Sequence, residues 1–393
     1  MQQRFFVPWL MGLLLTCAIG IGFWRSPSVE TGYSSSNPDV LAQSSDPSAP
    51  GFLDIESLSV ESEHLLQDIE ALAFERASES GRSRARRYLT RQLEAAGWAV
   101  EAQIVIPSAT FLEPQGGVNL VAVRLIDQEL RSSEPENSEL NNPELNNPEL
   151  DNPELDNPET YNPAELAPEL ATELIVAAHY DTVADSLGAD DNGSGVATLL
   201  ALARIFGDRP TPHPLKLVLF DHEEKGLWGS QAFVGSLVND RHPVMGAVVL
   251  EMLGYACDVS GCQTYPDVLP ITPPSDVGNF LAVVGNAEHP ELTQAFQPQV
   301  VQSNHSSEPF SLLPLQVPAL SPGSPDLLRS DHVPFWQNGY GAVMLTDTAN
   351  FRNPHYHQPS DRPETLNPDF LSYAATTVAR AIARLLTTPH SPS

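Results

Sequence analysis

The chain has 393 residues, which corresponds to one large domain with decorations or to two or three smaller domains. Asp and Glu number 50 against 20 Lys and Arg, and a formal charge of −30 argues against a basic surface that follows nucleic-acid phosphates. Three cysteines are too few for a disulfide scaffold or a structural zinc module. We therefore expect no nucleic-acid partner and a fold that rests on its hydrophobic core.

The chain begins with an apolar run that could cross a membrane. Residues 7–24 carry no charge, and at about 1.5 Å per residue they reach roughly 27 Å, enough to span a bilayer. Residues 1–25 are either an uncleaved signal anchor or a cleaved signal peptide, and a lipoprotein signal at Cys17 is disfavoured because Thr16 precedes it. In each case we expect the body outside the cytoplasm, periplasmic or extracellular, anchored to the membrane through this segment or secreted.

Two stretches of biased composition interrupt the chain. Residues 26–51 are rich in Ser, Pro, Asp and Asn and cannot bury enough apolar surface to fold, so they are predicted to be a tether. Residues 127–170 contain an acidic repeat, NPELN NPELD NPELD, whose prolines prevent a continuous helix and whose period is too short for a solenoid. We expect an extended surface loop within one domain over 52–388, and a net charge that says little about the substrate.

Outside these stretches, the predicted elements alternate between helix and strand. Apolar residues at helical spacing predict helices over 62–76, over 82–96, from near Gly193, from near Leu227 and over 363–386. Alternation or short apolar runs predict strands over 98–106, 174–178, 215–220 and 246–250. The sequence therefore predicts an α/β domain with a mostly parallel mixed sheet flanked by helices on both faces.

Acidic and imidazole side chains follow three of the predicted strands. His179 and Asp181 come after the first, Glu223 and Glu224 after the second, and Glu251 after the third. Because open α/β sheets bind ligands at the carboxyl ends of their strands, we expect these side chains to share one site. Two carboxylates directly after an apolar strand are costly unless a cation meets them, although a solvated acidic turn would look the same.

A glycine-rich loop over 188–195 leads from the first of these strands into a helix. Such a loop can bind phosphate through backbone N–H groups, but adjacent Asp190 and Asp191 without a lysine favour a cation. Imidazole and several carboxylates form a zinc-type ligand set, in which Asp181 would orient the ring of His179. Of the pair Glu223 and Glu224, one is expected to act as a base and the other as a ligand.

These residues carry a resemblance to a known family. From about Phe52 to Leu386 the chain resembles the zinc metallopeptidases related to aminopeptidase Y, glutamate carboxypeptidase II and glutaminyl cyclase, and is most similar to bacterial di-zinc aminopeptidases. The motifs that carry it, in chain order, are His179-x-Asp181, Gly188 to Gly195, Phe220 to Glu224, Leu250 to Met252, Ser330 to Phe335 and Asn353 to His357. The resemblance implies a zinc pair at the carboxyl edge of the sheet.

The resemblance also implies a role for each residue. Asp191 would bridge two zinc ions, with one ion completed by His179 and Glu251 and the other by Glu224 and His357. Glu223 would be the general base that takes a proton from the attacking water, and Tyr356 would donate a hydrogen bond to the tetrahedral intermediate. The family's bridging Asp usually precedes a cis peptide bond, here between Asp191 and Asn192.

Some assignments have competitors. Asp190 competes with Asp191 as the bridge, and His355 competes with His357, although the family's motif spacing selects the second of each pair. His332 could line the cleft or brace a loop. Glu251 stands where typical family aminopeptidases have Asp, which leaves the polarity of an exopeptidase open. Cys257 and Cys262 could form a local disulfide in an exported chain or remain free thiols in a cytosolic one.

The function expected from these residues is a di-zinc aminopeptidase that hydrolyses N-terminal residues from peptides. The alternatives are a glutaminyl cyclase-like acyltransferase, which uses one zinc, a carboxypeptidase or dipeptidase, and a non-catalytic interaction module on a peptidase fold. The intact set of ligand-type residues favours an enzyme over the module. The sequence does not specify the side-chain preference or the oligomeric state.

Overall fold

The computed structural model describes residues 54–106, 116–127, 172–268, 271–297, 310–319 and 325–388, which all belong to one compact unit. The expected segments 1–25 and 26–51, and nearly all of the acidic loop over 127–170, lie outside these residues. Among the residues it does describe, no helix combines the length and the apolar character needed to cross a membrane.

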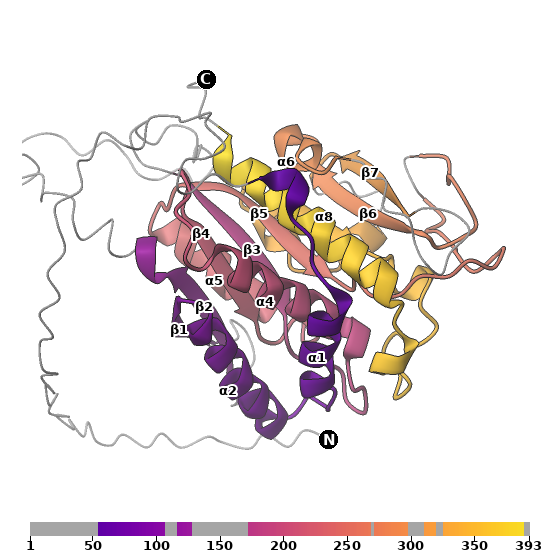
Figure 1. The fold of residues 1–393 in the computed structure, drawn as a ribbon, viewed down its shortest axis with the longest axis horizontal. Helices are drawn as coiled ribbons and strands as arrows, with labels where there is room; N and C mark the ends of the chain where they lie inside the picture. Colours follow the sequence, from indigo (N-terminus) through magenta and orange to yellow (C-terminus); the bar gives the residue numbers. More distant parts are fainter. Residues whose placement is uncertain are drawn as a thin grey trace, which may run out of the picture. The chain divides into compact units, whose positions relative to one another are not determined.

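The centre of the fold is an eight-stranded sheet in the order β1-β2-β4-β3-β5-β8-β6-β7 (Figure 1). Its strands are β1 (Trp98–Val105), β2 (Gly117–Arg124), β3 (Glu173–His179), β4 (Leu215–Phe220), β5 (Val244–Glu251), β6 (Phe280–Asn286), β7 (Ser311–Val317) and β8 (Ala342–Thr346). The four strands β4, β3, β5 and β8 run parallel, whereas β1, β2 and β6 join by antiparallel pairing. The expected mostly parallel mixed sheet is confirmed.

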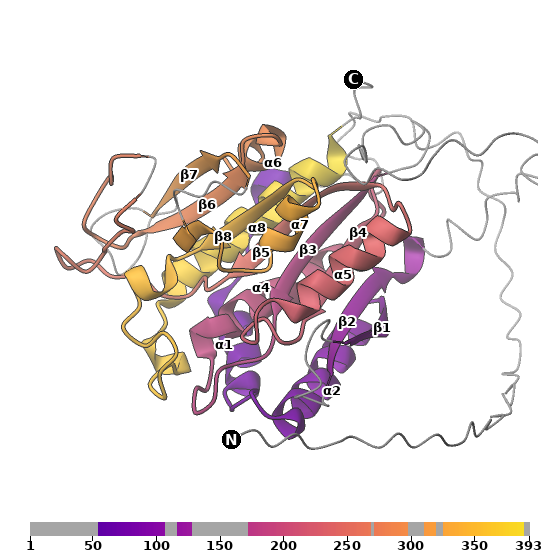
Figure 2. The ribbon, with the colours of Figure 1, turned by 180° about the vertical axis from the view of Figure 1, so that it is seen from behind.

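Helices cover both faces of the sheet, as expected. One face packs against α1 (Ser62–Leu72), α2 (Glu79–Ala95), α4 (Gly195–Phe206), α6 (Pro290–Gln294) and α8 (Pro368–Thr387). Figure 2 shows the opposite face, which carries α5 (Trp228–Asn239) and α7 (Val333–Gln337). Successive side chains of a strand point to opposite faces, so in β3 Val176 joins the first core and Ile175 and Ala177 join the second. Burial on both faces explains the continuous apolar runs of the sequence.

The helix boundaries differ from the predicted ones for local reasons. The last helix begins at Pro368, not at 363, because the Asn367 side chain accepts the Phe370 N–H at 3.0 Å and caps it. Residues 363–365 form a separate single turn. The first helix ends at Leu72, not at 76, and the second begins at Glu79, where the Ser78 hydroxyl caps it by accepting the Gly81 N–H at 3.3 Å.

Four strands were missing from the predicted set: β2, β6, β7 and β8. Strand β7 contains Pro314, which cannot donate a ladder hydrogen bond, and its position at the edge of the sheet explains why the proline is tolerated. These additional strands matter for function because β6, β7 and β8 line the pocket beside the site described next.

Candidate active site

The predicted site residues converge at the carboxyl edge of the parallel strands. Strand β3 ends at His179, β5 ends at Glu251, and Glu223 and Glu224 follow the end of β4 at Phe220. His179 and Phe220 are register partners, so the first two strands end at the same level. The turn over Ala189–Ser194 that precedes α4 adds Asp191.

Each oxygen of the Asp191 carboxylate faces a different histidine. Its Oδ1 lies 3.4 Å from His179 Nε2, and its Oδ2 lies 3.2 Å from His357 Nε2. The same ring nitrogens approach a second carboxylate each, at 3.4 Å to Glu251 Oε1 and at 3.1 Å to Glu224 Oε2. This is the arrangement that a bridging carboxylate between two cations requires.

Two groups of ligand-type atoms result among the described residues, and the atoms of each group all lie within 4.8 Å of one another. One consists of His179, Glu223 and Glu251, and the other of Asp191, Glu224 and His357. Glu223 therefore lies close enough to the first group to be a ligand or a base by geometry alone. Distinguishing these roles requires the variants described in the Discussion.

The competing residues are engaged elsewhere. The Asp190 carboxylate accepts the Gly254 N–H at 2.9 Å and the Asn353 side-chain amide at 2.6 Å, away from the histidines. His355 Nδ1 shares a hydrogen bond of 2.9 Å with the Ser360 hydroxyl. Asp191 and His357, in contrast, face each other within the cluster. His332 Nε2 bonds to the Leu327 carbonyl at 2.9 Å, so this buried histidine braces a loop.

Hydrogen bonds hold the backbone on which the candidate ligands stand. The Asp181 carboxylate accepts the N–H groups of Glu223 and Glu224 at 3.1 and 3.3 Å, and it lies 3.5 Å from His179 Nδ1. It therefore contacts the ring and also the loop that carries the two glutamates. This second function extends the expected role of Asp181 as a partner of His179.

Asp361 supports the Asp191 loop in the same way. Its carboxylate oxygens accept the backbone N–H groups of Asp190 and Asp191 at 2.9 and 3.0 Å. The sequence reasoning did not single out Asp361, and the only available signal was its place four residues after His357. Ser330, which belongs to a quoted motif, donates its hydroxyl to Glu251 Oε2 at 2.6 Å, a contact that no spacing rule predicted.

Asn192 joins the Asp191 loop to the end of β5. Its peptide bond with Asp191 is cis, as the family resemblance implied. The Asn192 side chain donates to the Leu250 carbonyl at 2.8 Å and accepts the Met252 N–H at 3.1 Å. These two contacts are made to the residues before and after Glu251 and so fix the position of Glu251 relative to Asp191.

The cluster carries an excess of negative charge in a buried place. Among its described ion pairs, Asp191, Glu224 and Glu251 contact histidines and no lysine or arginine. Burial raises the pKa of Glu223 well above its usual range, and burial together with Asp191 raises that of Glu224 to about 7. Burial alone would lower the pKa of His357, but Asp191 and Glu224 outweigh it and raise the pKa to about 10.

One oxygen of this cluster has no partner. Glu224 Oε1 is buried and makes no hydrogen bond to any described residue. A buried carboxylate oxygen without a donor is costly, and a cation placed among these groups would remove the cost. The donor set of imidazole nitrogens and carboxylate oxygens fits zinc.

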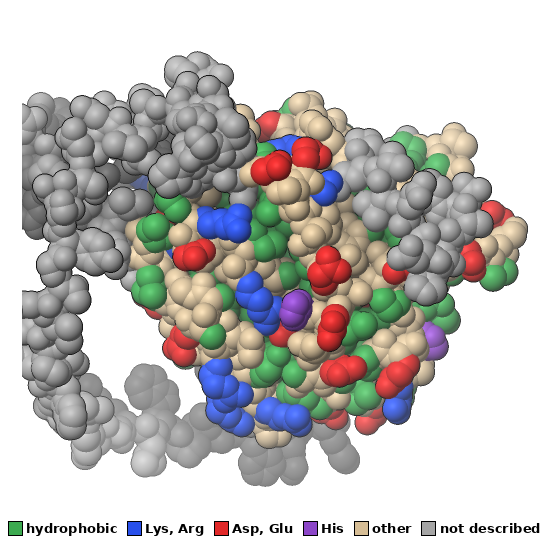
Figure 3. All heavy atoms as spheres, in the orientation of Figure 1, with side chains coloured by type: hydrophobic (Ala, Val, Ile, Leu, Met, Phe, Trp, Pro, Cys, Tyr) green, Lys and Arg blue, Asp and Glu red, His purple; other side chains and the backbone are tan. Residues whose placement is uncertain are grey.

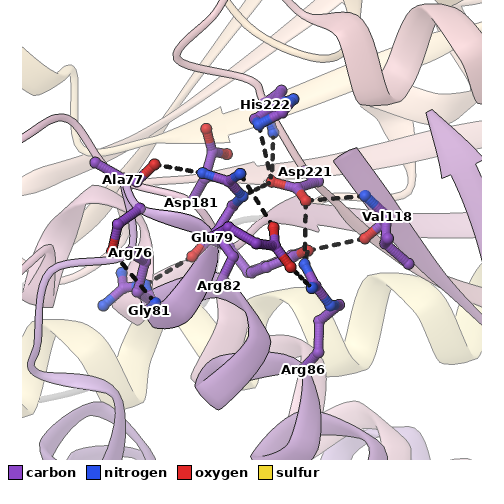
Figure 4. Close-up of polar contacts among 12 residues, drawn as sticks. Arg76, Ala77, Glu79, Gly81, Arg82, Arg86, Val118, Asp181, Asp221 and His222 are labelled. Carbon is purple, nitrogen blue, oxygen red and sulfur yellow. Dashed lines mark hydrogen bonds and ion pairs between the residues drawn. The ribbon is translucent and has the colours of Figure 1, made fainter. Parts of the chain in front are cut away.

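Next to this cluster, another buried acid is paired with arginines (Figure 4). Asp221, directly after β4, lies 3.0 Å from Arg82 Nε and 3.4 Å from Arg86 Nη1, and it accepts the Val118 N–H at 2.9 Å. Burial and the neighbouring Asp181 raise the pKa of Asp221, while Val118, His222 and Arg82 oppose them. Both arginines belong to α2, whose region of the surface shows further basic side chains (Figure 3).

A pocket opens beside the cluster. Its polar end consists of Asp191, Glu223, Glu224, Glu251 and His357. Its apolar walls come mainly from β6, β7, β8 and the loops that cover them, with Ala282, Val284, Leu313, Leu315, Met344 and Phe351 among the lining residues. The ring of Tyr356 stacks on His357 with centroids 3.8 Å apart, so Tyr356 lines the pocket next to the cluster.

The segment after β5 contains a disulfide. Cys257 and Cys262 are bridged, in agreement with the local disulfide that their spacing allowed. The residues that follow, Thr264 and Tyr265, line the pocket, and Thr264 donates its N–H to the Phe351 carbonyl at 2.8 Å. The bridge therefore closes a small loop next to one wall of the pocket.

Comparison with known proteins agrees with this geometry. A profile of Peptidase family M28 matches residues 163–382, more than half of the chain. The chain belongs to Peptidase family M28. This confirms the family resemblance, and the expected enzyme class, a metallopeptidase, is confirmed at the level of the family.

Individual curated proteins match parts of the chain. The uncharacterized protein YfbL of Escherichia coli is 35% identical over 215 residues, which cover 52% of this chain and 64% of YfbL. Aminopeptidase YwaD of Bacillus subtilis is 44% identical over 62 residues, 16% of this chain and 14% of YwaD. The chain thus spans less than two thirds of either relative.

The fold is also found in a solved aminopeptidase. The structure of the Legionella pneumophila LapA aminopeptidase aligns with a TM-score of 0.54 at 17% identity, covering 84% of this chain and 73% of LapA. At this identity the likeness shows the fold alone, and it confirms the expected architecture.

Proposed function

We propose that the chain is a two-zinc aminopeptidase that hydrolyses N-terminal residues from peptides outside the cytoplasm. The observation that carries the proposal is the Asp191 carboxylate, whose two oxygens face His179 and His357 in a buried acidic cluster. Glu251 and Glu224 complete the two sets of donors. Cations would compensate this charge, and zinc suits the donors.

In this proposal Asp191 would contribute to both metal sites, His179 and Glu251 would hold one zinc ion, and Glu224 and His357 would hold the other. Zinc bound there would supply Lewis-acid chemistry, which lowers the pKa of water and stabilises negative charge in the transition state. Asp181 and Asp361 keep the ligands in place through the backbone contacts described above.

Glu223 is the proposed general base. It lies next to His179 and Glu251, and the five ligands proposed above leave it available to act as a base. It would accept the proton of the attacking water and pass it to the leaving amine. The hydroxyl of Tyr356 would donate a hydrogen bond to the oxyanion that develops on the scissile carbonyl.

The choice of an aminopeptidase rests on three features. YwaD, which matches this chain locally, is named an aminopeptidase. The second set of donors, Glu224 and His357 with Asp191, is present, whereas a glutaminyl cyclase-like enzyme would need one zinc. The apolar pocket beside the cluster can take one side chain of the substrate.

The proposed location rests on chemistry as well. Disulfides persist in oxidising compartments, and Cys257 and Cys262 are bridged. The apolar run over 7–24 would direct export and, if retained, would anchor the protein to a membrane.

The deciding experiment combines metal analysis with a substrate panel. Protein lacking residues 1–51 should bind two zinc ions per chain and hydrolyse aminoacyl substrates but not their N-blocked counterparts. A strong chelator should abolish this activity, and added zinc should restore it. One zinc at saturation would contradict the two-metal assignment, and hydrolysis of N-blocked peptides would contradict the aminopeptidase assignment.

A further inference from the structure

The pocket contains one fixed cation. Among the described residues that line it, Arg329 is the only lysine or arginine. Its Nη2 donates to Tyr356 Oη at 3.1 Å, and its Nη1 donates to Asn350 Oδ1 at 3.0 Å. The side chain is 43% exposed, so the guanidinium is held on one side and open on the other.

Arg329 lies next to both halves of the proposed zinc site. Its partner Tyr356 stacks on His357 of one half, with ring centroids 3.8 Å apart. The next residue in the chain, Ser330, donates to Glu251 of the other half at 2.6 Å. A substrate whose reacting carbonyl lies between these halves would place its following residue near the guanidinium.

We propose that Arg329 binds a carboxylate of the substrate directly after the scissile bond, so that short peptides with a free C-terminal carboxylate are preferred. This inference rests on the proposed function. A guanidinium has five N–H donors in a planar fork that matches a carboxylate, and its described contacts leave donors free. Consecutive residues are about 3.8 Å apart, so the carboxylate of a dipeptide reaches this side of the pocket.

The charge of the neighbourhood supports this role. The remaining charged groups that line the pocket, apart from His357, are carboxylates, and Asp326 Oδ1 lies 3.5 Å from Arg329 Nη1. An acidic substrate end would be repelled by this surface without the guanidinium. Arg329 therefore provides a specific anchor in an otherwise unfavourable place.

The test compares charged and uncharged ends of the same substrate. The kcat/KM of wild type and Arg329→Gln would be measured with leucylglycine, leucylglycinamide and leucylaspartate α-amide. We expect a fall of about 10- to 100-fold for leucylglycine and a change below about threefold for leucylglycinamide. Arg329→Lys should restore part of the loss, and Arg91→Gln on the exposed side of α2 should change nothing.

Three outcomes would overturn the proposal. An equal fall for leucylglycine and its amide would mean that Arg329 only positions Tyr356. Equal kcat/KM values for the two substrates in wild type would mean that the carboxylate is not recognised. Dependence on Arg329 for leucylaspartate α-amide alone would assign the anchor to an acidic side chain instead of the C-terminus.

A binding measurement separates this inference from the proposed function. Glu223→Gln protein loaded with zinc would be titrated calorimetrically with leucylglycine and leucylglycinamide, with and without Arg329→Gln. Tighter binding of the acid that disappears with Arg329→Gln supports the anchor even if no peptide is hydrolysed. Equal binding of acid and amide overturns the anchor even if the enzyme is an active aminopeptidase.

Discussion

A single buried acid and an acidic cluster lie side by side at the carboxyl edge of the sheet, and their charges have different kinds of partner. Asp221, after β4, is paired with Arg82 and Arg86 from α2 (Figure 4). Asp191 and Glu224, in the acidic cluster, have only histidines as ion-pair partners among the described residues, and Glu224 Oε1 has no hydrogen-bond partner. The first acid is paired with arginines of the protein itself, whereas the second group is the place where we propose that cations bind.

This contrast distinguishes an acid with a structural role from acids with a proposed functional role. It does so without any comparison to related proteins. A buried carboxylate that the chain itself neutralises contributes to packing and to the position of a helix. A group of buried carboxylates without arginine or lysine is unstable by itself, and such places are candidates for metal binding. The predictions below test this division.

The largest effect is expected for the adjacent residues Glu223 and Glu224. Glu223→Gln should retain both zinc ions and substrate affinity but lower kcat by about 10²- to 10⁴-fold, because it loses the general base. Glu224→Gln should bind one zinc more weakly, and excess zinc should restore part of its activity. Both would be measured by zinc analysis and by kcat and KM across a zinc titration.

The two variants serve as controls for each other, since they differ by one position in the same loop. Zinc should not rescue Glu223→Gln, because its metal sites are already filled. If the two phenotypes are exchanged, the roles of base and ligand must be exchanged. If both variants remain fully active with two metals, the loop has no catalytic role.

The second prediction concerns stability and addresses the comparison directly. Removing zinc should lower the free energy of unfolding by about 4 kcal/mol per site when free zinc exceeds the dissociation constant a thousandfold. Asp221→Asn should cost about 3–5 kcal/mol, because it removes the buried acid that Arg82 and Arg86 share and leaves them with Glu79 alone as an ion-pair partner. Thermal unfolding with and without chelator measures both effects.

Whether each effect depends on the chelator is more informative than the size of the effect. Asp221→Asn should lower the melting temperature equally with and without chelator and should still bind two zinc ions. Loss of zinc from Asp221→Asn would show that the arginine cluster also shapes the metal site. An unfolding curve that does not respond to chelator in the wild type would show that the acidic cluster needs no cation.

A smaller effect is expected for Asp361, which supports the site through the backbone. Asp361→Asn keeps one acceptor oxygen for the N–H groups of Asp190 and Asp191 but loses the charge. Zinc affinity should fall by about 10- to 100-fold, as is typical for groups that orient ligands. Competition with a chelator of known affinity measures this, and the exposed Asp240→Asn is the matched control.

Asp361 would be merely structural if its variant lost stability but kept the zinc affinity of the wild type. A fall in zinc affinity that Asp240→Asn does not share, at an unchanged melting temperature of the metal-free protein, would support its role in positioning Asp191. The two readouts therefore separate support of the ligand from support of the fold.

The sequence predicted three of the four parallel strands at the centre of the sheet because they are buried on both faces and their apolar runs are nearly continuous, whereas it missed the equally buried β8. Strands β3, β4 and β5 were found, and the residues after them define the site. Strand β7 was missed because it contains a proline and is exposed at several positions, which weakens its pattern, whereas β6 was missed although all its residues are buried. The pocket walls that they provide could therefore not be foreseen.

The candidate site was predictable where the residue type itself indicates metal binding, as for His179 or Asp191. The supporting contacts of Ser330 and Asp361 were not, because each joins residues far apart in the chain. Spacing rules describe neighbours along one strand or loop, whereas these hydrogen bonds depend on how distant loops meet. Arg329 was not predicted as a site residue for the same reason, since only the folded chain brings it into contact with Tyr356.

The smallest effect is expected for the acidic repeat, although it holds a large share of the chain's negative charge. Val123 of β2 and Ile175 of β3 both pair with Lys216 of β4, so the segment joins strands that lie only two strand spacings, about 10 Å, apart. Deletion of 132–168 leaves seven residues between Asp127 and Thr172, which can extend over about 25 Å.

Because loop-closure entropy varies only logarithmically with length, this deletion should change the free energy of unfolding by no more than about 1–2 kcal/mol. Zinc content and kcat/KM should stay at the values of the parent protein, since the carboxylates proposed to bind zinc lie at the strand ends and not in the repeat. Denaturant unfolding and zinc analysis of parent and deletion variant test this. A large loss of stability would show that the repeat packs against the domain, and a loss of zinc would show that acidity outside the buried cluster also recruits metal.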